Sequence, residues 1–131
     1  MNVRLAAMMN RRLIYGRPDL TELAEFSATE QVKKDVCRTK MFNVVLVCLE
    51  VGQEIPPHPE PYDVCFYVME GEGTFTVGDE RSTLKEGQMI FAPGNIARGI
   101  RSTKRLTILG IQEAPWPPIV DLQMRGLSQH R

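Results

Sequence analysis

The sequence predicts an all-β protein of one domain, folded as a barrel or sandwich of short strands. Short stretches with strand character recur along residues 31–114, and glycine-containing turns separate them at intervals of about eight to twelve residues. Nine prolines and ten glycines favour a turn-rich β protein over a helix bundle. At 131 residues the chain is long enough to bury a single core without disulfides or metals.

Several stretches combine apolar or β-branched residues with a turn signal at each end, and we expect each to form a strand. The turns between them carry glycine, for example Gly71 and Gly73, because glycine adopts positive φ angles without steric cost. Closing the strands into a jelly-roll barrel would protect their edges. The expected strands cover residues 32–39, 42–51, 64–70, 74–77, 81–84, 88–92, 97–101 and 105–111.

The chain divides into a leading segment at residues 1–30, a barrel at 31–114 and a tail at 115–131. The leading segment is poorly periodic, but residues 20–26 predict a short helical turn capped by Asp19 or Thr21.

The tail begins with a proline-rich run that cannot continue a sheet, so its Trp116 is expected to anchor the tail on the barrel or on a partner. A short C-terminal helix is expected over residues 119–127.

Four prolines interrupt the segment between two of the predicted strands, at Pro56, Pro57, Pro59 and Pro61. Each lacks an N–H group and fixes its φ angle. We therefore expect this segment to be extended but to stay outside the hydrogen-bonded sheet.

The stretch over residues 42–51 is apolar on both faces, as in a strand that is covered on both sides. Its second face needs cover either from the N-terminal residues or from another subunit. This pattern is one of two reasons to expect a homodimer.

The composition counts against several classes of protein. Sixteen basic and sixteen acidic residues give a net charge of zero, whereas a nucleic-acid surface needs a basic excess or stripe. No stretch approaches the roughly 20 apolar residues of a membrane-spanning helix, and polar residues between positions 4 and 12 interrupt any secretion signal. Cys37, Cys48 and Cys65 form no paired pattern. We expect a soluble, cytoplasmic protein with reduced thiols that contacts neither nucleic acid nor membrane.

One run of residues resembles the first signature motif of the cupin family. That motif reads glycine, five residues, His-x-His, three or four residues, Glu, six residues, Gly. In this chain Gly52 and Gly71 keep the frame and His58 keeps the first histidine. Glu60 stands at the second histidine and Val64 at the acidic position.

A later run resembles the second cupin motif, which reads glycine, five residues, Pro-x-Gly, two residues, His, three residues, Asn. Gly87 and Pro93 are kept. Asn95 stands at the second glycine, Arg98 at the metal-binding histidine and Ser102 at the asparagine. The resemblance implies a double-stranded β-helix, that is, a small jelly-roll barrel with an internal cavity. The resemblance to small cupins also implies a homodimer, and this is the second reason to expect one.

The resemblance further implies a metal held by three histidines and one glutamate, which this chain cannot supply from one subunit. It has two histidines, His58 and His130, and the second lies in the tail. A weaker set of His58, Glu60 and Asp63 offers one nitrogen and two carboxylates, which iron, manganese or zinc accept. Arg98 would then direct a permanent positive charge at the ion. We expect no metal and no other cofactor.

The replacements suggest a different centre. His58, Glu60 and Val64 are separated by even numbers of residues, so in an extended segment they share a face. The resemblance places that face inward and brings Arg98 from the facing strand. Our hypothesis is that the guanidinium replaces the missing ion, either paired with Glu60 or free to bind an anionic ligand. The alternative is that Arg98 extends into solvent at the barrel mouth and touches nothing inside.

The expected ligand-binding residues are His58, Glu60, Tyr62, Phe66 and Arg98. No catalytic residue can be assigned, but His58 is the candidate general base, with Glu60 or Asp63 to orient it. Tyr62 is the favoured acid at the mouth, and Phe66 is a core residue that also borders the cavity. Structural roles for His58 and Tyr62 remain the alternative.

Three functions follow, and whether the protein is an enzyme stays open. The first is a metal-free barrel that binds a small anionic or polar molecule. The second is a metal-independent isomerase or epimerase with His58 as base. The third is a metal-dependent, dioxygenase-like cupin with an altered ligand set.

Overall fold

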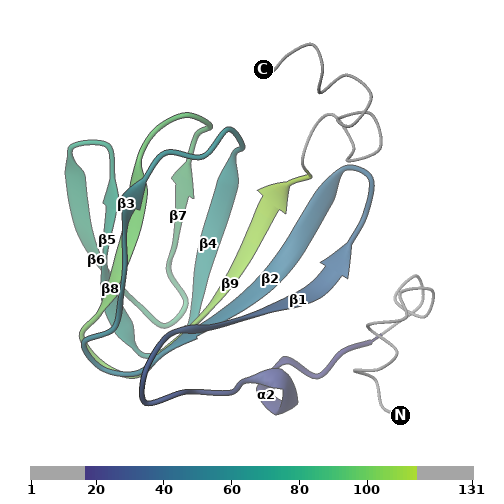
Figure 1. Ribbon diagram of the computed structural model, residues 1–131, viewed down its shortest axis with the longest axis vertical. Coiled ribbons are helices and arrows are strands. Elements are labelled where there is room, and N and C mark those ends of the chain that lie inside the picture. Colours follow the sequence, from purple (N-terminus) through teal and green to yellow (C-terminus); the bar gives the residue numbers. More distant parts are fainter. Residues whose placement is uncertain (1–16, 115–131) are drawn as a thin grey trace.

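The computed structural model describes residues 17–114, which form two antiparallel sheets facing each other (Figure 1). Within these residues there are nine strands and one short helix. In chain order they are α2 (Leu20–Leu23), β1 (Val32–Arg38), β2 (Phe42–Leu49), β3 (Glu54–His58), β4 (Val64–Glu70), β5 (Glu72–Val77), β6 (Glu80–Lys85), β7 (Met89–Ala92), β8 (Arg98–Ser102) and β9 (Leu106–Glu113).

The chain crosses repeatedly between the two sheets. One sheet has the strand order β1-β2-β9-β4-β7 and the other has the order β3-β8-β5-β6. From β2 to β9, every connection except β5–β6 therefore passes from one sheet to the other. This arrangement confirms the predicted all-β jelly roll, and the predicted strands agree with the observed ones to within about two residues.

The prediction for the proline segment was wrong, because β3 lies in this segment and pairs with β8. Ile55 lies opposite Ile100 and His58 lies opposite Arg98, with a register shift between these two pairs. The first two prolines fall within the shift, where no regular ladder bond is needed. In addition, β3 is the edge strand of its sheet, and prolines are tolerated at edges and bulges.

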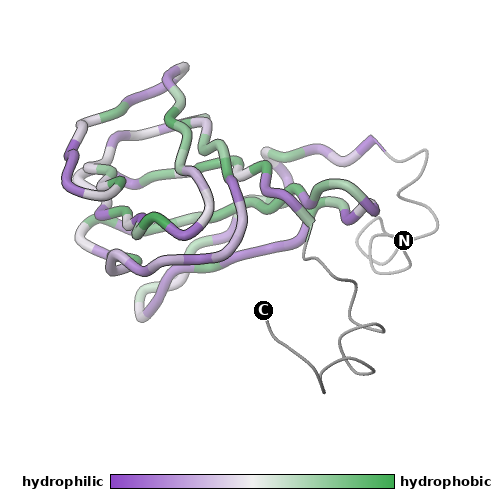
Figure 2. Tube along the Cα trace, turned by 90° about the horizontal axis from the view of Figure 1, so that it is seen from above, coloured by the Kyte–Doolittle hydropathy of each residue, from purple (hydrophilic) through white to green (hydrophobic). Residues whose placement is uncertain are grey.

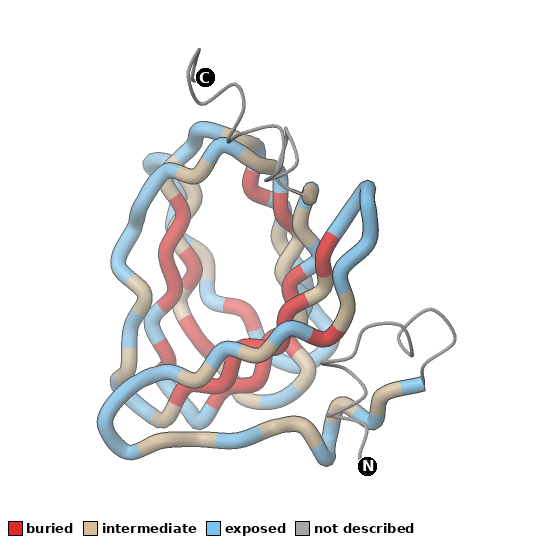
Figure 3. Tube along the Cα trace, turned by 45° about the vertical axis from the view of Figure 1, so that its right-hand side comes forward, coloured by how far each residue is buried: buried red, intermediate tan, exposed pale blue. Residues whose placement is uncertain are grey.

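The two sheets come together at the lower end of the barrel and lie further apart at the upper end (Figure 1). Inward-facing side chains of both sheets form the main core, and Figure 3 shows buried residues along strands of the barrel. The core consists of Val45, Val47, Leu49, Val68, Phe75, Leu84, Ile100, Leu106 and Ile108.

A second core lies on the outer face of the five-stranded sheet. Leu20, Leu23 and Phe26 from the leading segment pack near the buried Leu46 and Cys48. The sequence predicted that either N-terminal residues or another subunit would cover the second apolar face of β2. The N-terminal residues cover that face here. Figure 2 shows this leading segment running beside the barrel.

The helix α2 begins as predicted at Asp19. The Asp19 side chain accepts hydrogen bonds from the backbone N–H groups of Thr21 (3.0 Å) and Glu22 (3.2 Å). These bonds satisfy two of the free donors at the helix start. Arg105 covers the Phe26 ring at 3.8 Å and helps to hold the segment that follows the helix.

In residues 17–114 no helix is long and apolar enough to cross a membrane. Cys37, Cys48 and Cys65 are all unpaired within these residues. The predicted C-terminal helix and Trp116 lie outside the described residues.

Candidate functional site

A cavity of about 110 Å³ lies between the two sheets towards the upper end of the barrel. All five of the residues expected at the site border it. Its apolar lining comes from Val45, Val47, Ile55, Val64, Phe66 and Ile100. Its polar lining comes from Lys33, His58, Glu60, Tyr62, Arg98 and Gln112.

The deeper part of the cavity is apolar because β2 and β4 turn every second side chain inward. Val45 lies in register with Gly110, which in turn lies opposite Phe66. Gly110 has no side chain, and the Phe66 ring carbons lie about as close as van der Waals contact allows to where its Cβ would be. Phe66 also packs against the core residue Phe75, with ring centroids 6.1 Å apart.

Arg98 comes from the first position of β8 and is buried, with only 6% of its surface exposed. Its guanidinium donates to backbone carbonyls only. Nε donates to Ile96 (2.9 Å) and Nη1 to Tyr62 (3.2 Å), and Nη2 donates to Pro93 (2.7 Å) and more weakly to Glu60 (3.5 Å). These acceptors belong to the β3–β4 and β7–β8 loops, so Arg98 ties the two loops together.

Two of the expectations for Arg98, the ion pair with Glu60 and the extension into solvent, are wrong. Within residues 17–114 its guanidinium makes no ion pair with a carboxylate, and it meets Glu60 only at the backbone carbonyl. It does not extend into solvent either. The reason is that carbonyls in two converging loops lack ladder partners, and a planar guanidinium with five N–H groups can satisfy several of them at once.

Two further contacts join the same loops. Asn95 donates its backbone N–H to the Glu60 carbonyl at 2.6 Å. Asn95 has a φ angle of 68°, so it adopts the left-handed conformation at the position where the second motif usually has glycine. The Asp63 carboxylate accepts from the Gly94 N–H at 2.8 Å, so Asp63 holds this loop and does not orient His58.

His58 and Glu60 form a pair at the mouth. The distance from His58 Nδ1 to Glu60 Oε2 is 3.0 Å, with side-chain exposures of 67% and 36%. An ionised carboxylate can only accept, so Nδ1 carries the proton. When the ring is neutral, Nε2 is then left as the basic nitrogen.

Tyr62 lies under the Arg98 guanidinium, whose central carbon is 5.5 Å from the ring centroid. Burial raises the pKa of the Tyr62 hydroxyl above its ordinary value, the negative charge of Glu60 raises it further, and Arg98 partly opposes both effects. The hydroxyl therefore stays protonated at neutral pH.

Sequence reasoning missed two polar residues of the cavity, Lys33 and Gln112. Lys33 lies on β1 opposite Val47, and Gln112 lies on β9 opposite Val64. Alternation along β1 could have shown that Lys33 faces away from Val32 and Val36. The register that brings it beside the cavity is set by pairing with β2, which local sequence does not reveal.

The residues at the cupin ligand positions do not fit a metal ion. His58 and Glu60 are mutually bonded, Val64 offers no donor atom, and the Arg98 guanidinium is a cation itself. In the part of the chain that the structure describes, no three His, Cys, Asp or Glu side chains lie close enough together to share an ion.

Comparison with known proteins identifies the family. The sequence model of the cupin domain matches residues 45–111, slightly more than half of the chain and the whole of the cavity lining from β2 to β8. The chain belongs to the cupin family. No curated protein matches this cupin.

Solved structures with the same fold are numerous. The protein TT1209 of Thermus thermophilus is 28% identical with a TM-score of 0.71, over 75% of this chain and 96% of that one. An RmlC-like cupin from Desulfovibrio desulfuricans is 26% identical with a TM-score of 0.69, over 75% and 95%.

A Klebsiella pneumoniae protein with a double-stranded β-helix domain is 21% identical with a TM-score of 0.71, over 78% of this chain and 92% of that one. These likenesses agree with the predicted double-stranded β-helix.

Proposed function

We propose that this cupin binds a small polar or anionic molecule, without a metal, in the cavity between the two sheets. The observation that carries the proposal is the cavity itself, with an apolar inner part and a polar rim on which His58, Glu60 and Lys33 stand. This combination is typical of sites for small molecules. A cavity of roughly 150 Å³ can hold benzene, so the 110 Å³ here suits a ligand of only a few carbon atoms.

The site can be preformed although its residues do not fit a metal ion. In this chain Arg98 holds the β3–β4 and β7–β8 loops through backbone carbonyls of both. The position of the His58–Glu60 pair at the start of the first loop is therefore supported without an ion.

A second candidate function is proton transfer, as in an isomerase or epimerase. It is favoured by the His58–Glu60 pair, because the carboxylate orients the ring and the imidazole can then take a proton from the ligand at Nε2. Tyr62 is the candidate acid, since its hydroxyl keeps its proton at neutral pH. The third possibility, a dioxygenase-like activity, has the least support because the donor set does not fit a metal.

We also propose that this cupin is a homodimer, for a different reason from the one that the sequence suggested. The leading segment covers part of the outer face of the five-stranded sheet. Farther along the same face, Tyr67, Met89, Phe91 and Ile111 are exposed large apolar residues on β4, β7 and β9. Such a group of side chains is more typical of an interface than of a free surface.

Thermal unfolding with a panel of small acids, amides and polyols tests the main proposal. Ile55 is half-buried on the edge strand, so an Ile55→Trp substitution should fill the cavity, whereas Val51→Trp places the same ring on an exposed turn. A ligand at 100 times its Kd adds about 2.7 kcal/mol of stability. We expect that gain in the wild type and in Val51→Trp but not in Ile55→Trp. Equal gains in all three proteins, or no gain with any compound, would refute the proposal.

A turnover assay with any compound that binds separates a binder from an enzyme. His58→Gln should abolish exchange or isomerisation while Ile55→Trp abolishes binding. If His58→Gln turns over as fast as the wild type, the proton-transfer candidate is excluded.

Light scattering tests the dimer proposal by measuring the molecular mass of the protein in solution. Phe91→Ser should weaken self-association at least about tenfold, since burying a large aromatic side chain contributes more than about 1.4 kcal/mol. Val51→Ser, at an exposed apolar residue elsewhere, should leave it unchanged. A wild type that is monomeric at all concentrations contradicts the proposal.

A further inference from the structure

The cavity is bordered by two cations, and they differ in what their donors already bind. Arg98 directs its guanidinium at four backbone carbonyls. It is buried under the same loops, with 6% of its surface exposed. A ligand could bind it bidentately only by displacing these carbonyls, which would leave buried acceptors without donors. Arg98 is therefore a structural cation.

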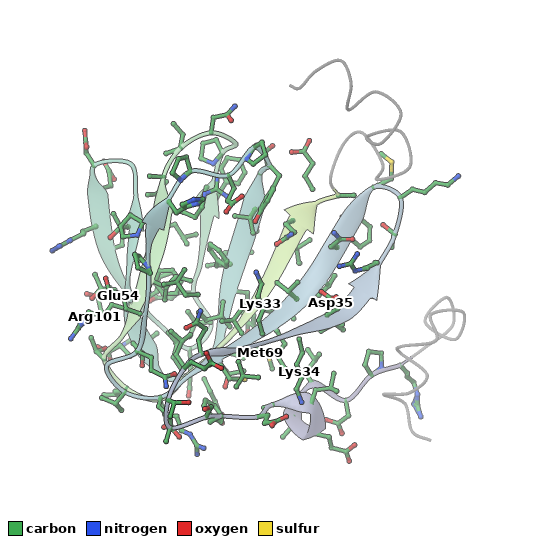
Figure 4. The ribbon with its side chains drawn as sticks, in the orientation of Figure 1. Lys33, Lys34, Asp35, Glu54, Met69 and Arg101 are labelled. Carbon is green, nitrogen blue, oxygen red and sulfur yellow. The ribbon has the colours of Figure 1, made fainter. Side chains whose placement is uncertain are left out.

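Lys33 is the second cation, and it is exposed at the open side of the barrel. It lies opposite Val47 in β1, so it faces the cavity, while the neighbouring Lys34 faces the other way. Figure 4 shows the two side chains on opposite sides of β1. Lys34 is bonded to Glu25 at 2.7 Å, whereas Lys33 makes no ion pair within residues 17–114.

The acidic groups nearest to Lys33 along the strand and around the cavity already have partners. Asp35, the next residue of β1 on the same side, pairs with Arg38 at 3.2 Å. Glu60, the carboxylate of the cavity lining, pairs with His58 at 3.0 Å. The lining thus holds two permanent cations against one carboxylate, and one of the two cations has free donors.

From these contacts we infer that the ligand carries a carboxylate group and that the Lys33 ammonium binds it. This inference rests on the proposed function, because it concerns the occupant of the same cavity. A compact ammonium with one unmatched positive charge suits a monoanion. A phosphate dianion is better matched by several donors or an arginine fork, which are not free here.

The inference also orients the ligand. Its carboxylate lies towards β1, its apolar part contacts Val45, Val47 and Phe66, and any further polar group lies towards His58. Lys33, Val45, Val47, His58 and Phe66 all line this cavity.

Matched pairs of acids and amides test the inference by calorimetry. Isobutyrate and isobutyramide have nearly the same shape, as do propionate and propionamide, and within each pair only the acid carries a charge. We expect the wild type to bind the acids at least about tenfold more tightly than the amides, a difference of about 1.4 kcal/mol. In Lys33→Met this preference should disappear, and raising the salt concentration should weaken it in the wild type.

Lys34→Met is the control, since it removes the same charge one residue away on the other side of the strand. It should keep the preference for acids. Both lysines are at most partly buried, so neither variant should change the unfolding midpoint by more than a few degrees.

The possible results separate this inference from the proposed function. If acids and amides bind equally well and Ile55→Trp blocks both, the cavity is a binding site but the carboxylate inference is wrong. If Lys33→Met keeps the preference for acids, Lys33 is not the group that binds them. If no acid and no amide binds to the wild type, the carboxylate inference is wrong. The proposed function is contradicted as well only if no polyol of the thermal-unfolding panel binds either.

Discussion

The two ends of this barrel are held together in different ways. At the lower end the sheets meet through apolar side chains, and Leu49, Phe75 and Leu106 are almost completely buried. At the upper end the loops meet through polar contacts, with the Arg98 guanidinium donating to carbonyls on both sides. One end is a core, and the other is a frame around a cavity.

This difference separates stability from binding. Apolar packing at the lower end is dense and tolerates little change. Hydrogen bonds at the upper end position the loops while leaving their side chains His58 and Glu60 exposed towards a ligand. Substitutions at the mouth should therefore affect the site more selectively than substitutions at the lower end, and the following measurements test this contrast.

The largest effect is expected at Gly71 in the lower end. Gly71 has a φ angle of 89°, and a Cβ atom there would overlap the Arg105 carbonyl oxygen. The neighbouring atoms belong to the backbone of Arg105 and Leu106, which cannot move aside as a side chain could. Gly71→Ala should therefore cost at least about 4 kcal/mol of unfolding free energy or prevent folding.

The matched control is Gly87→Ala. Gly87 has a similar φ angle of 85°, but nothing lies within 4 Å of its Cβ position. Only the backbone strain remains, about 1–2 kcal/mol. Urea unfolding measures both variants, and similar costs at the two positions would contradict the steric explanation.

The next effect is expected at Arg98 in the mouth. Arg98→Met keeps much of the side-chain volume but removes the donors for carbonyls in both loops. We expect a loss of about 3 kcal/mol, because hydrogen bonds from a charged donor contribute about 1.5–3 kcal/mol each and water can replace some of them. Ligand binding should be lost as well, since the loops lose their link.

Arg101→Met is the comparison for this variant. Arg101 is on the same strand, but it is exposed and pairs with Glu54 at 3.3 Å (Figure 4). A surface pair of this kind contributes about 0–1 kcal/mol. If the two arginine variants lose equal stability, Arg98 is not the link between the loops.

A smaller effect concerns the ionisation of Tyr62. Burial raises the pKa of its hydroxyl in the folded protein above the value in the unfolded chain. Its stabilising contribution is thus complete below the unfolded pKa of about 10 and is lost as the pH rises towards the folded pKa. The tyrosinate absorbance of the wild type minus that of Tyr62→Phe should show a midpoint above about pH 10. A midpoint at or below that value would contradict the partly buried placement of the ring.

The smallest effect is expected from metals. Because the donor set does not fit an ion, adding zinc, manganese or iron(II), or removing metals with a chelator, should shift the unfolding temperature by less than about 1 °C. An ion bound at 100 times its Kd would add about 2.7 kcal/mol instead. A shift of several degrees that depends on His58 would show that the mouth holds an ion after all.

Much of this fold could be predicted from local sequence. Alternating apolar residues and glycine turns indicated the strands, Asp19 indicated the helix start, and the spacing from Gly52 to Gly71 indicated the family. These signals are local, since a strand face or a helix cap depends on residues only a few positions apart. The edge strand β3 was missed because prolines suggested a break, and only its position at the sheet edge makes them acceptable.

The sequence predicted residues that border the cavity, but it did not predict their contacts. The resemblance to the cupin motifs was enough to gather His58, Glu60, Tyr62, Phe66 and Arg98 at one cavity. It placed Arg98 on a facing strand, however, whereas β8 lies beside β3 in the same sheet and Glu60 and Tyr62 lie in the loop after β3. The contacts of Arg98 with loop carbonyls, and the free donors of Lys33, emerged only once the chain was folded. The reason is that a charged side chain pairs with the polar groups that lie within about 3 Å of it. The register of distant strands and the path of neighbouring loops decide which groups these are.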